Sequence, residues 1–204
     1  MKKILFLLMF LCGCTYIGYN DLHQPKNPNT NLLPAMKTKV NTLNLKAAFT
    51  DTTNDKDKIK RDERDIIVDD AVNIFEREVE QNITVGDGEK KGYIAFRIQY
   101  VDLEKSLPIR VVSIATLGIA NIFGFPAAKF TQTMEVEVEV TDRKQNVIKR
   151  YTETVENSAY VALYWGYRRK EVNRKLAAEN VKQALKIISA KINVDAPEIK
   201  QKLQ

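Results

Sequence analysis

The sequence predicts an α+β domain, a two-layer sandwich in which two helices cover one face of a mixed sheet. The clearest strand is residues 130–141, because apolar residues at the even positions from 134 to 140 alternate with glutamates. Residues 65–81 and 171–194 instead repeat apolar side chains at helical spacing, which gives each helix one apolar stripe. A sheet with one apolar face and two such helices bury their apolar surfaces most simply as two layers.

The strands and helices are expected in the order β-α-β-β-β-α. The first strand is predicted at 37–49, the second at 93–103 and the last at 147–157, after a polar turn. Because a helix connects the first two strands, these strands are expected to run parallel. Lys149 or Arg150, whichever faces outward, can pair with the glutamate row of the neighbouring strand. In the second strand, one face is expected to carry Ile94, Phe96, Ile98 and Tyr100.

The apolar stripes define the two helices. Asp69 and Asp70 are adjacent in the first one and do not face each other, so they are expected to be solvent-facing charges rather than a carboxylate pair. Pro197 is expected to end the second helix, which closes the domain 37–195 and leaves 196–204 as a loose tail. The stripes are Val68, Ala71, Val72, Phe75 and Val79 in the first helix and Ala177, Val181, Ala184, Leu185, Ile188 and Ile192 in the second.

Residues 1–13 have the features of an export signal. Two lysines precede an uncharged apolar run at 4–11, which is far shorter than the ~20 residues that span a bilayer. Leu11-Cys12-Gly13-Cys14 then resembles the bacterial lipobox, with an aliphatic residue three positions before Cys14 and a small residue directly before it. This resemblance implies cleavage after Gly13 and attachment of diacylglycerol and an N-acyl chain, such as palmitate, to Cys14. An ordinary secretory peptide is the alternative, but no A-x-A-like cleavage site follows.

Residues 14–36 are expected to form a lipidated flexible tether, because they are rich in Pro and Asn and lack apolar periodicity. In the enterobacterial lipoproteins that the lipobox resembles, a residue other than aspartate after the cysteine goes with the outer membrane, and Thr15 stands there. The resemblance therefore implies the periplasmic face of the outer membrane. Residues 50–65 are expected to form a solvated loop, since their aspartates lack the spacing and the glycine of a calcium loop.

The inventory of reactive side chains argues against an enzyme. The two cysteines, Cys12 and Cys14, lie within the signal and lipobox, and the one histidine, His23, lies in the tether. The expected domain therefore has no thiol nucleophile, disulfide, histidine-based triad or common zinc site. The net charge of +6 either suits anionic lipid headgroups or keeps a mixed charged surface soluble. No nucleic acid, small-molecule substrate, metal or further cofactor is implied for an exported, anchored chain.

Two stretches do not fit a minimal domain. Residues 111–128 carry no charge, yet their glycines and proline argue against a membrane-spanning helix. This stretch either caps the core or exposes an apolar patch to a membrane or a partner. Residues 160–170 place aromatic side chains before three basic ones, as at a membrane interface. The alternative for this second stretch is a packed strand end followed by a basic helical turn.

The alternating strand directions bring the loops 104–129 and 158–170 to one end of the sheet, while the chain enters the sheet at the opposite end. We therefore expect a surface for a partner or a membrane at this apolar and aromatic end, formed by 107–129 with 158–170. Its candidate residues are Leu117, Ile119, Ile122, Phe123, Phe125, Trp165, Tyr167, Arg168 and Arg169.

The lipobox, the polar tether and the β-α-β-β-β-α order together resemble small periplasmic lipoproteins with a fold like the amino-terminal domain of the Tol translocation protein, such as the curli-secretion and lipopolysaccharide-assembly lipoproteins. This resemblance implies a non-enzymatic accessory role in envelope assembly or transport, through another envelope protein or copies of the same chain. The alternative is a membrane-surface or lipid-handling protein. In the curli-secretion family, segments inserted between strands become membrane hairpins. The stretch 107–129 departs from a transmembrane β-strand, because glycines and a proline break it and its apolar residues do not alternate.

Overall fold

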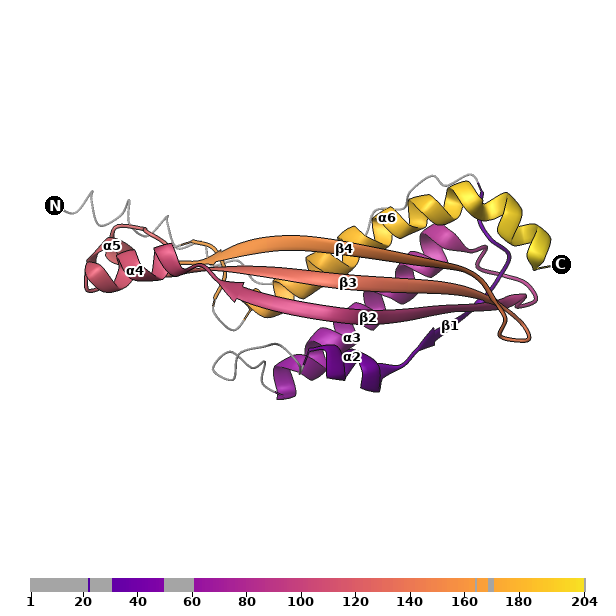
Figure 1. The fold of residues 1–204 in the computed structure, drawn as a ribbon, viewed down its shortest axis with the longest axis horizontal. Helices are drawn as coiled ribbons and strands as arrows, with labels where there is room; N and C mark the ends of the chain where they lie inside the picture. Colours follow the sequence, from indigo (N-terminus) through magenta and orange to yellow (C-terminus); the bar gives the residue numbers. More distant parts are fainter. Residues whose placement is uncertain (1–21, 23–30, 50–60, 164, 169–170, 204) are drawn as a thin grey trace.

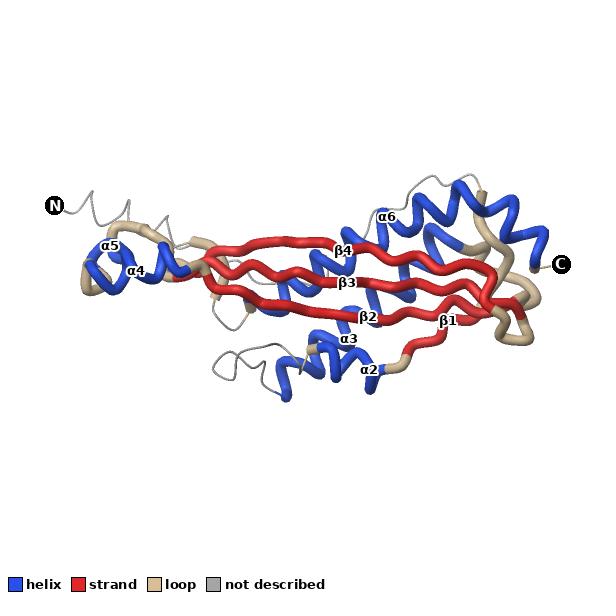
Figure 2. Tube along the Cα trace, in the orientation of Figure 1, coloured by secondary structure: helices blue, strands red, loops and turns tan. Residues whose placement is uncertain are grey.

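Four strands form one mixed sheet in the order β1-β2-β3-β4 (Figure 1). The computed structural model describes residues 22, 31–49, 61–163, 165–168 and 171–203. The short β1 pairs in parallel with β2, and β3 runs antiparallel to both β2 and β4. The long helices α3 and α6 pack on one face of the sheet (Figure 2), which confirms the predicted α+β class and its mixed sheet. The strands are β1 (Lys37–Val40), β2 (Gly92–Lys105), β3 (Ala128–Asp142) and β4 (Val147–Val161).

The core lies between this sheet and the helices α3 (Arg61–Glu78) and α6 (Val172–Lys202). The alternation in β3 places Met134, Val136, Val138 and Val140 in that core, all without exposed surface. The rings of Phe75 from α3 and Phe96 from β2 stack with their centroids 4.8 Å apart. Both predicted helical stripes are buried, apart from the partly buried Val72.

A β-bulge in β2 corrects the predicted face of this strand. The pairing with β3 shifts between Ile98 and Tyr100, so that Gln99 is an extra residue. An extra residue reverses the alternation of the side chains that follow it. Tyr100, expected in the core, is therefore 49% exposed, and Val101 is buried in its place.

The first predicted strand is wrong beyond its fourth residue. Asn41 ends β1 and caps α2 (Thr42–Ala48), because its side-chain oxygen accepts hydrogen bonds from the backbone N–H groups of Leu43 and Asn44. Leu45 and Phe49 are fully buried at the i, i+4 spacing of a helix. The four-residue interval between these two side chains was the signal that an alternating reading misses.

Some of the chain before β1 belongs to the folded domain rather than to a tether. Leu33 is fully buried, and its backbone N–H donates to the carbonyl oxygen of Ile83 over 2.8 Å. Leu22 and Met36 also lie in the main core. The tether prediction is therefore wrong for these positions, because backbone pairing and apolar burial hold them. The lipobox with Cys14 and residues 15–21 and 23–30 of the predicted tether lie outside the described residues.

Two further boundaries differ from the prediction. α3 begins at Arg61, so the end of the expected loop 50–65 is helical, whereas residues 50–60 lie outside the described part of the chain. The last turn of α3 widens into a π-helical turn, η3 (Val79–Ile83). α6 continues through Pro197 to Lys202, so the expected loose tail is wrong. Ala196, Ile199 and Leu203 are buried there, and their packing offsets the cost of about 3 kcal/mol for a proline within a helix.

Charged side chains join the elements in two ways that bear on the predictions. Arg150 donates to Glu139 across β3 and β4 over 2.9 Å, as expected for an outward-facing cation. Asp69 is exposed, but Asp70 is buried and accepts a hydrogen bond from Nη2 of Arg174 on α6 over 3.2 Å. The expectation of a solvent-facing Asp70 is therefore wrong, because a basic partner from a distant segment faces it.

Candidate interaction surface

The segment between β2 and β3 folds into two short helices at one end of the sheet (Figure 1). They are α4 (Leu107–Ala115) and α5 (Ile119–Ile122), and we call residues 106–127 the tip. Pro108 lies in the first turn of α4, where its missing N–H is tolerated. Leu117 and Gly118 turn the chain between the helices with positive φ angles of 50° and 79°.

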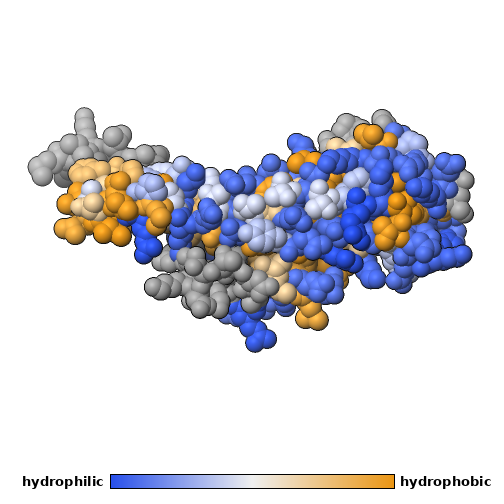
Figure 3. All heavy atoms as spheres, in the orientation of Figure 1, coloured by the Kyte–Doolittle hydropathy of each residue, from blue (hydrophilic) through white to orange (hydrophobic). Residues whose placement is uncertain are grey.

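The tip exposes its apolar side chains instead of capping the core. Leu117 is 90% exposed and Phe123 is 86% exposed, and α4 buries no residue at all. Figure 3 shows apolar side chains gathered over α4 and α5 at one end of the molecule. Of the two alternatives for this stretch, the structure therefore has the exposed patch. The exposed large apolar residues of the tip are Leu107, Val111, Val112, Ile114, Leu117, Ile119, Ile122 and Phe123.

Polar side chains hold the inside of the tip together. Asn121 is the one buried residue between positions 106 and 127. Its side-chain amide donates to the hydroxyl oxygen of Ser113 over 3.2 Å and to the carbonyl oxygen of Phe125 over 3.1 Å. Ser113 in turn donates to the carbonyl oxygen of Pro126 over 3.4 Å. The tip therefore has a defined shape that does not depend on an apolar core of its own.

The segment after β4 fastens the tip to the sheet. Nε1 of Trp165 donates to the carbonyl oxygen of Gly124 over 2.8 Å. The ring of Trp165 also lies against Tyr160 of β4, with the centroids 5.8 Å apart. Gly166 lets this segment fold back with φ +76°, because a Cβ there would lie 2.5 Å from the carbonyl oxygen of Tyr160. The two unusual stretches of the sequence thus meet at one end of the molecule.

The predicted surface residues occupy different environments. Four of them are exposed on the tip, namely Leu117, Ile119, Ile122 and Phe123, and Phe125 is partly buried beside them. Trp165 is 41% exposed and Arg168 is exposed, whereas Arg169 lies outside the described residues. Tyr167 is partly buried against the small cluster of Phe130, Ala159, Val172 and Leu176, with Nζ of Lys175 5.5 Å from its ring centroid. Tyr167 therefore also supports the base of the surface.

Sequence reasoning missed part of this surface. The named candidate residues begin at Leu117, although the predicted surface 107–129 also includes Leu107, Val111 and Ile114 of α4, which are exposed as well. Their spacing of i, i+4 and i+7 is that of one helical face, which was the available signal. The sequence predicts a loop for this part of the chain because its two helices are short and Gly118 separates them.

This end of the molecule is basic. No Asp or Glu occurs between positions 105 and 134 or between 157 and 170, whereas both intervals contain lysine and arginine. Nζ of Lys105 lies 5.4 Å from the ring centroid of Phe130, and Nζ of Lys129 lies 5.9 Å from that of Tyr160. These cation–π contacts place two positive charges at the base of the tip. We call Lys105, Arg110, Lys129 and Arg168 the basic residues of the tip end.

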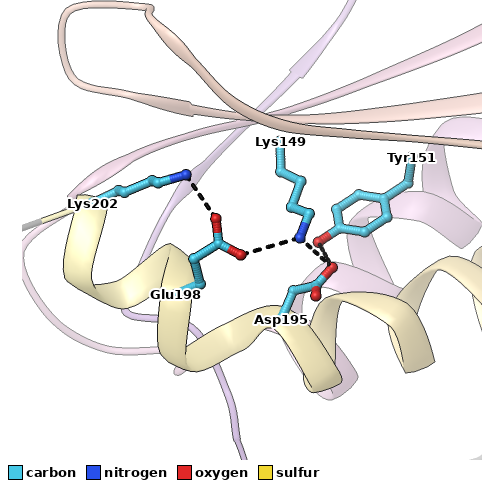
Figure 4. Close-up of polar contacts among 5 residues, drawn as sticks. All are labelled: Lys149, Tyr151, Asp195, Glu198 and Lys202. Atoms are coloured by element: carbon cyan, nitrogen blue, oxygen red, sulfur yellow. Dashed lines mark hydrogen bonds and ion pairs between the residues drawn. The ribbon is translucent and has the colours of Figure 1, made fainter.

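The most connected group of titratable side chains lies elsewhere, between β4 and the C-terminal part of α6 (Figure 4). Nζ of Lys149 contacts Asp195 over 2.9 Å and Glu198 over 3.3 Å, and the hydroxyl of Tyr151 donates to Asp195 over 2.8 Å. The hydrogen bond from Lys149 lowers the pKa of Asp195, and the same contact raises the pKa of Lys149. Burial raises the pKa of the Tyr151 phenol. These groups neutralise one another, so their evident effect is to fasten α6 to the edge strand.

Two features of the described residues bear on other functional classes. No group of three or more His, Cys, Asp or Glu side chains in this part of the chain is arranged to hold a metal ion. No helix there has the length and apolar character needed to cross a membrane. α4, the most apolar of the helices, has nine residues.

Two solved structures are similar to this chain at low sequence identity. One is a protein of family DUF330 from Xanthomonas campestris, with 12% identity, a TM-score of 0.40 and coverage of 88% of this chain and 91% of that chain. The other is described as a "putative lipoprotein" from Caulobacter crescentus CB15, with 9% identity, a TM-score of 0.36 and coverage of 77% and 98%. No family model and no curated protein sequence matches the chain. At these identities and TM-scores the similarities assign neither a family nor a function to this chain.

Proposed function

We propose that this protein is an envelope lipoprotein, anchored through Cys14, whose domain is a non-enzymatic binding or assembly module. Its working surface is the tip together with Trp165. One observation carries this proposal: eight large apolar side chains of the tip, including Leu117 and Phe123, are exposed to solvent, while hydrogen bonds hold the tip in a fixed shape. A contiguous exposed apolar patch is typical of a site that binds a protein or a membrane.

The anchor and the location belong to the same proposal. The lipobox supports lipidation of Cys14, and Thr15 supports the periplasmic face of the outer membrane. A non-enzymatic role is supported by the residue inventory, because His23 and the two cysteines all precede β1 in the sequence. The occupant of the tip is then either another envelope protein or a further copy of this chain.

A second candidate function is a membrane-surface or lipid-handling role. The observation that favours it is the charge of the tip end, where basic residues occur without any acidic residue in two intervals of the chain. Anionic headgroups attract nearby Lys and Arg by about 1 kcal/mol for each cation. Both candidates use the same surface, so one experiment tests whether that surface is occupied at all.

Site-specific photo-crosslinking in cells tests the proposal. A photoreactive residue at position 117 or 123 is expected to give discrete adducts, either to protein or to lipid, because these side chains project from the tip. Leu43 on α2 and Val194 on α6 provide matched controls, since both are apolar and 76% exposed but lie on other elements. If the tip positions give no more adducts than these controls, the tip is not the working surface and the proposal fails.

A further inference from the structure

The tip has the polarity of a membrane-embedded element. In a domain that is surrounded by water, apolar side chains face inward and polar ones face outward. In the tip the amide of Asn121 is buried, and it is bonded to Ser113 and to a backbone carbonyl, while the large apolar side chains face outward. Polar groups satisfied internally and apolar groups directed outward are what a hydrocarbon environment requires.

The backbone of the tip also satisfies its donors internally where the helices end. The N–H of Gly118 donates to the carbonyl oxygen of Ser113 over 2.8 Å, and the N–H of Phe125 donates to that of Ala120 over 3.0 Å. At the base, the N–H of Ala127 donates to the carbonyl oxygen of Val161 over 2.7 Å. These turns therefore keep their hydrogen bonds when water is removed from around them.

The apolar surface of the tip is wide rather than flat. Val111 and Val112 are both exposed, although adjacent residues project about 100° apart around a helix. Leu107 and Ile114 extend this surface along α4, and Phe123 extends it beyond α5. A protein partner covers one side of such an element, whereas lipid chains surround it. The width of the exposed apolar surface therefore favours lipid over a single docking partner.

The charges lie where an anionic lipid surface would meet them. Lys105 and Lys129 are at the ends of β2 and β3, next to the base of the tip, and Arg168 follows the segment that Trp165 fastens to Gly124. The rings of Trp165 and Tyr160 also lie at the base of the tip, and such rings favour the headgroup region of a bilayer. The aromatic pair and the lysines thus lie together at the base of the apolar tip, whereas Arg110 lies within the tip on α4, where its long side chain has to extend back to the headgroups.

From these observations we propose that the tip inserts into the boundary between headgroups and acyl chains of an anionic bilayer, as a second membrane contact besides the lipid on Cys14. The inference rests on the tip being the working surface, and it deepens the second candidate function, because it names an anionic bilayer as the occupant of that surface. The nine residues of α4 span about 14 Å at 1.5 Å per residue, roughly half of the ~30 Å hydrocarbon core. The tip therefore enters one leaflet and does not cross the bilayer.

Vesicle binding by the mature chain with Cys14→Ser, which carries no lipid, tests this inference. We expect binding to vesicles of equal parts phosphatidylcholine and phosphatidylglycerol, weaker binding at high salt, and little binding to phosphatidylcholine alone. Trp165 is the single tryptophan, so its emission is expected to shift to the blue and to be quenched by brominated acyl chains. The double variant L117D/F123D is expected to bind at least about a hundredfold more weakly, since each apolar side chain contributes roughly tenfold.

A matched double variant separates insertion from a general loss of apolar surface. L43D/V194D also replaces two exposed apolar residues, on α2 and α6, and it is expected to bind vesicles like the parent chain. Circular dichroism of both variants checks that they are folded. Vesicle binding that L117D/F123D leaves unchanged would overturn the inference, and so would binding that does not depend on anionic lipid.

The same experiments distinguish the inference from the proposed function. If the parent chain does not bind anionic vesicles but photo-crosslinking from position 117 or 123 captures a discrete protein, the bilayer inference is wrong and the tip remains the working surface. If neither vesicle binding nor crosslinks above the controls are found, both proposals fail. Binding to anionic vesicles together with lipid adducts and no protein adduct at these positions supports the bilayer inference and the membrane-surface candidate, and it contradicts a protein occupant of the tip.

Discussion

The indole N–H of Trp165 and the carbonyl oxygen of Gly124 are 2.8 Å apart, and this hydrogen bond fastens the tip to the segment after β4. The two residues are separated by 41 positions in the sequence, so the contact exists only because β3 and β4 return the chain to this end. The tip is thus positioned by the sheet and by one aromatic side chain. A flexible appendage would lack such a contact.

Trp165→Phe tests this positioning role. Phenylalanine keeps a ring beside Tyr160 but removes the donor to Gly124, which costs about 1 kcal/mol locally. Hydrogen–deuterium exchange at the amides of Gly124 and Phe125 is expected to become up to about tenfold faster, whereas the amide of Val138 in β3 should not change. Unchanged exchange at Gly124 and Phe125 would mean that the tip holds its shape without this bond.

The ion pair between Asp70 and Arg174 predicts that removal of the Asp70 carboxylate greatly lowers the free energy of unfolding. Asp70→Ala leaves Arg174 without its partner at the interface of α3 and α6, so the free energy of unfolding is expected to fall by about 3 kcal/mol. Asp69→Ala is the matched control, because Asp69 is exposed on the next position of the same helix, and its effect should stay within ~0.5 kcal/mol. Urea unfolding of the two variants measures the difference. Equal effects would show that the pair contributes nothing specific.

Asp70 also illustrates what one sequence can and cannot predict. The alternation at positions 134–140 and the apolar stripe of α3 follow from local periodicity, so the sheet face and the helix face are predictable. The partner of Asp70 is 104 residues away in the sequence. Whether a charged side chain is buried or exposed depends on which distant residue faces it in the fold. Gln99 is similar, since a bulge becomes visible only when β2 is paired with β3.

The remaining errors have local causes that a strict reading of periodicity overlooks. Asn41 caps α2 with its side chain, and the buried residues Leu45 and Phe49 have helical spacing. However, α2 has only seven residues and directly follows the four-residue strand β1, so its helical periodicity is a weak signal in the sequence. Pro197 is accommodated because the residues around it are buried. The position of the candidate surface followed from the composition of its two stretches and from strand direction, whereas its helical conformation and the exposure of Leu107, Val111 and Ile114 did not.

Glu78 predicts a pH-dependent loss of stability. It is buried between η3 and α6, and burial raises the pKa of its carboxyl above the ordinary value of 4.5, although Asn82 donates a hydrogen bond to it over 2.8 Å. A raised pKa means that the folded state binds the proton more tightly than the unfolded state. The free energy of unfolding therefore decreases as the pH rises from about 4.5 through the raised pKa.

Glu78→Gln is expected to remove this pH dependence, because an amide of the same shape stays neutral. Its oxygen can still accept from Asn82, and its NH2 group can donate to the hydroxyl oxygen of Ser189, the second hydrogen-bond partner of the carboxyl. The variant should be more stable than the parent chain at neutral pH and should differ little from it near pH 4. Thermal unfolding between these pH values measures the effect, with Glu76→Gln, an exposed position of α3, as the control. A Glu78→Gln variant that is less stable at neutral pH would contradict the assignment.

Leu117 combines backbone strain with nearly complete exposure, and this combination separates stability from binding. A leucine at φ +50° is strained by about 1 kcal/mol, and a side chain that is 90% exposed makes little packing in return. Leu117→Asn is therefore expected to raise the free energy of unfolding by up to about 1 kcal/mol, because asparagine tolerates this conformation. The same change should weaken binding to anionic vesicles by roughly tenfold, since it removes an apolar side chain from the tip.

Gln145 provides the comparison for that result. It has φ +66° in the turn between β3 and β4, at the end of the sheet away from the tip, so Gln145→Asn should stabilise the domain to a similar degree and leave vesicle binding unchanged. Denaturant unfolding and vesicle binding are measured on both variants. If Leu117→Asn stabilises the domain and binding is retained, Leu117 does not enter the bilayer. If both variants lose binding equally, backbone strain rather than the apolar side chain determines it.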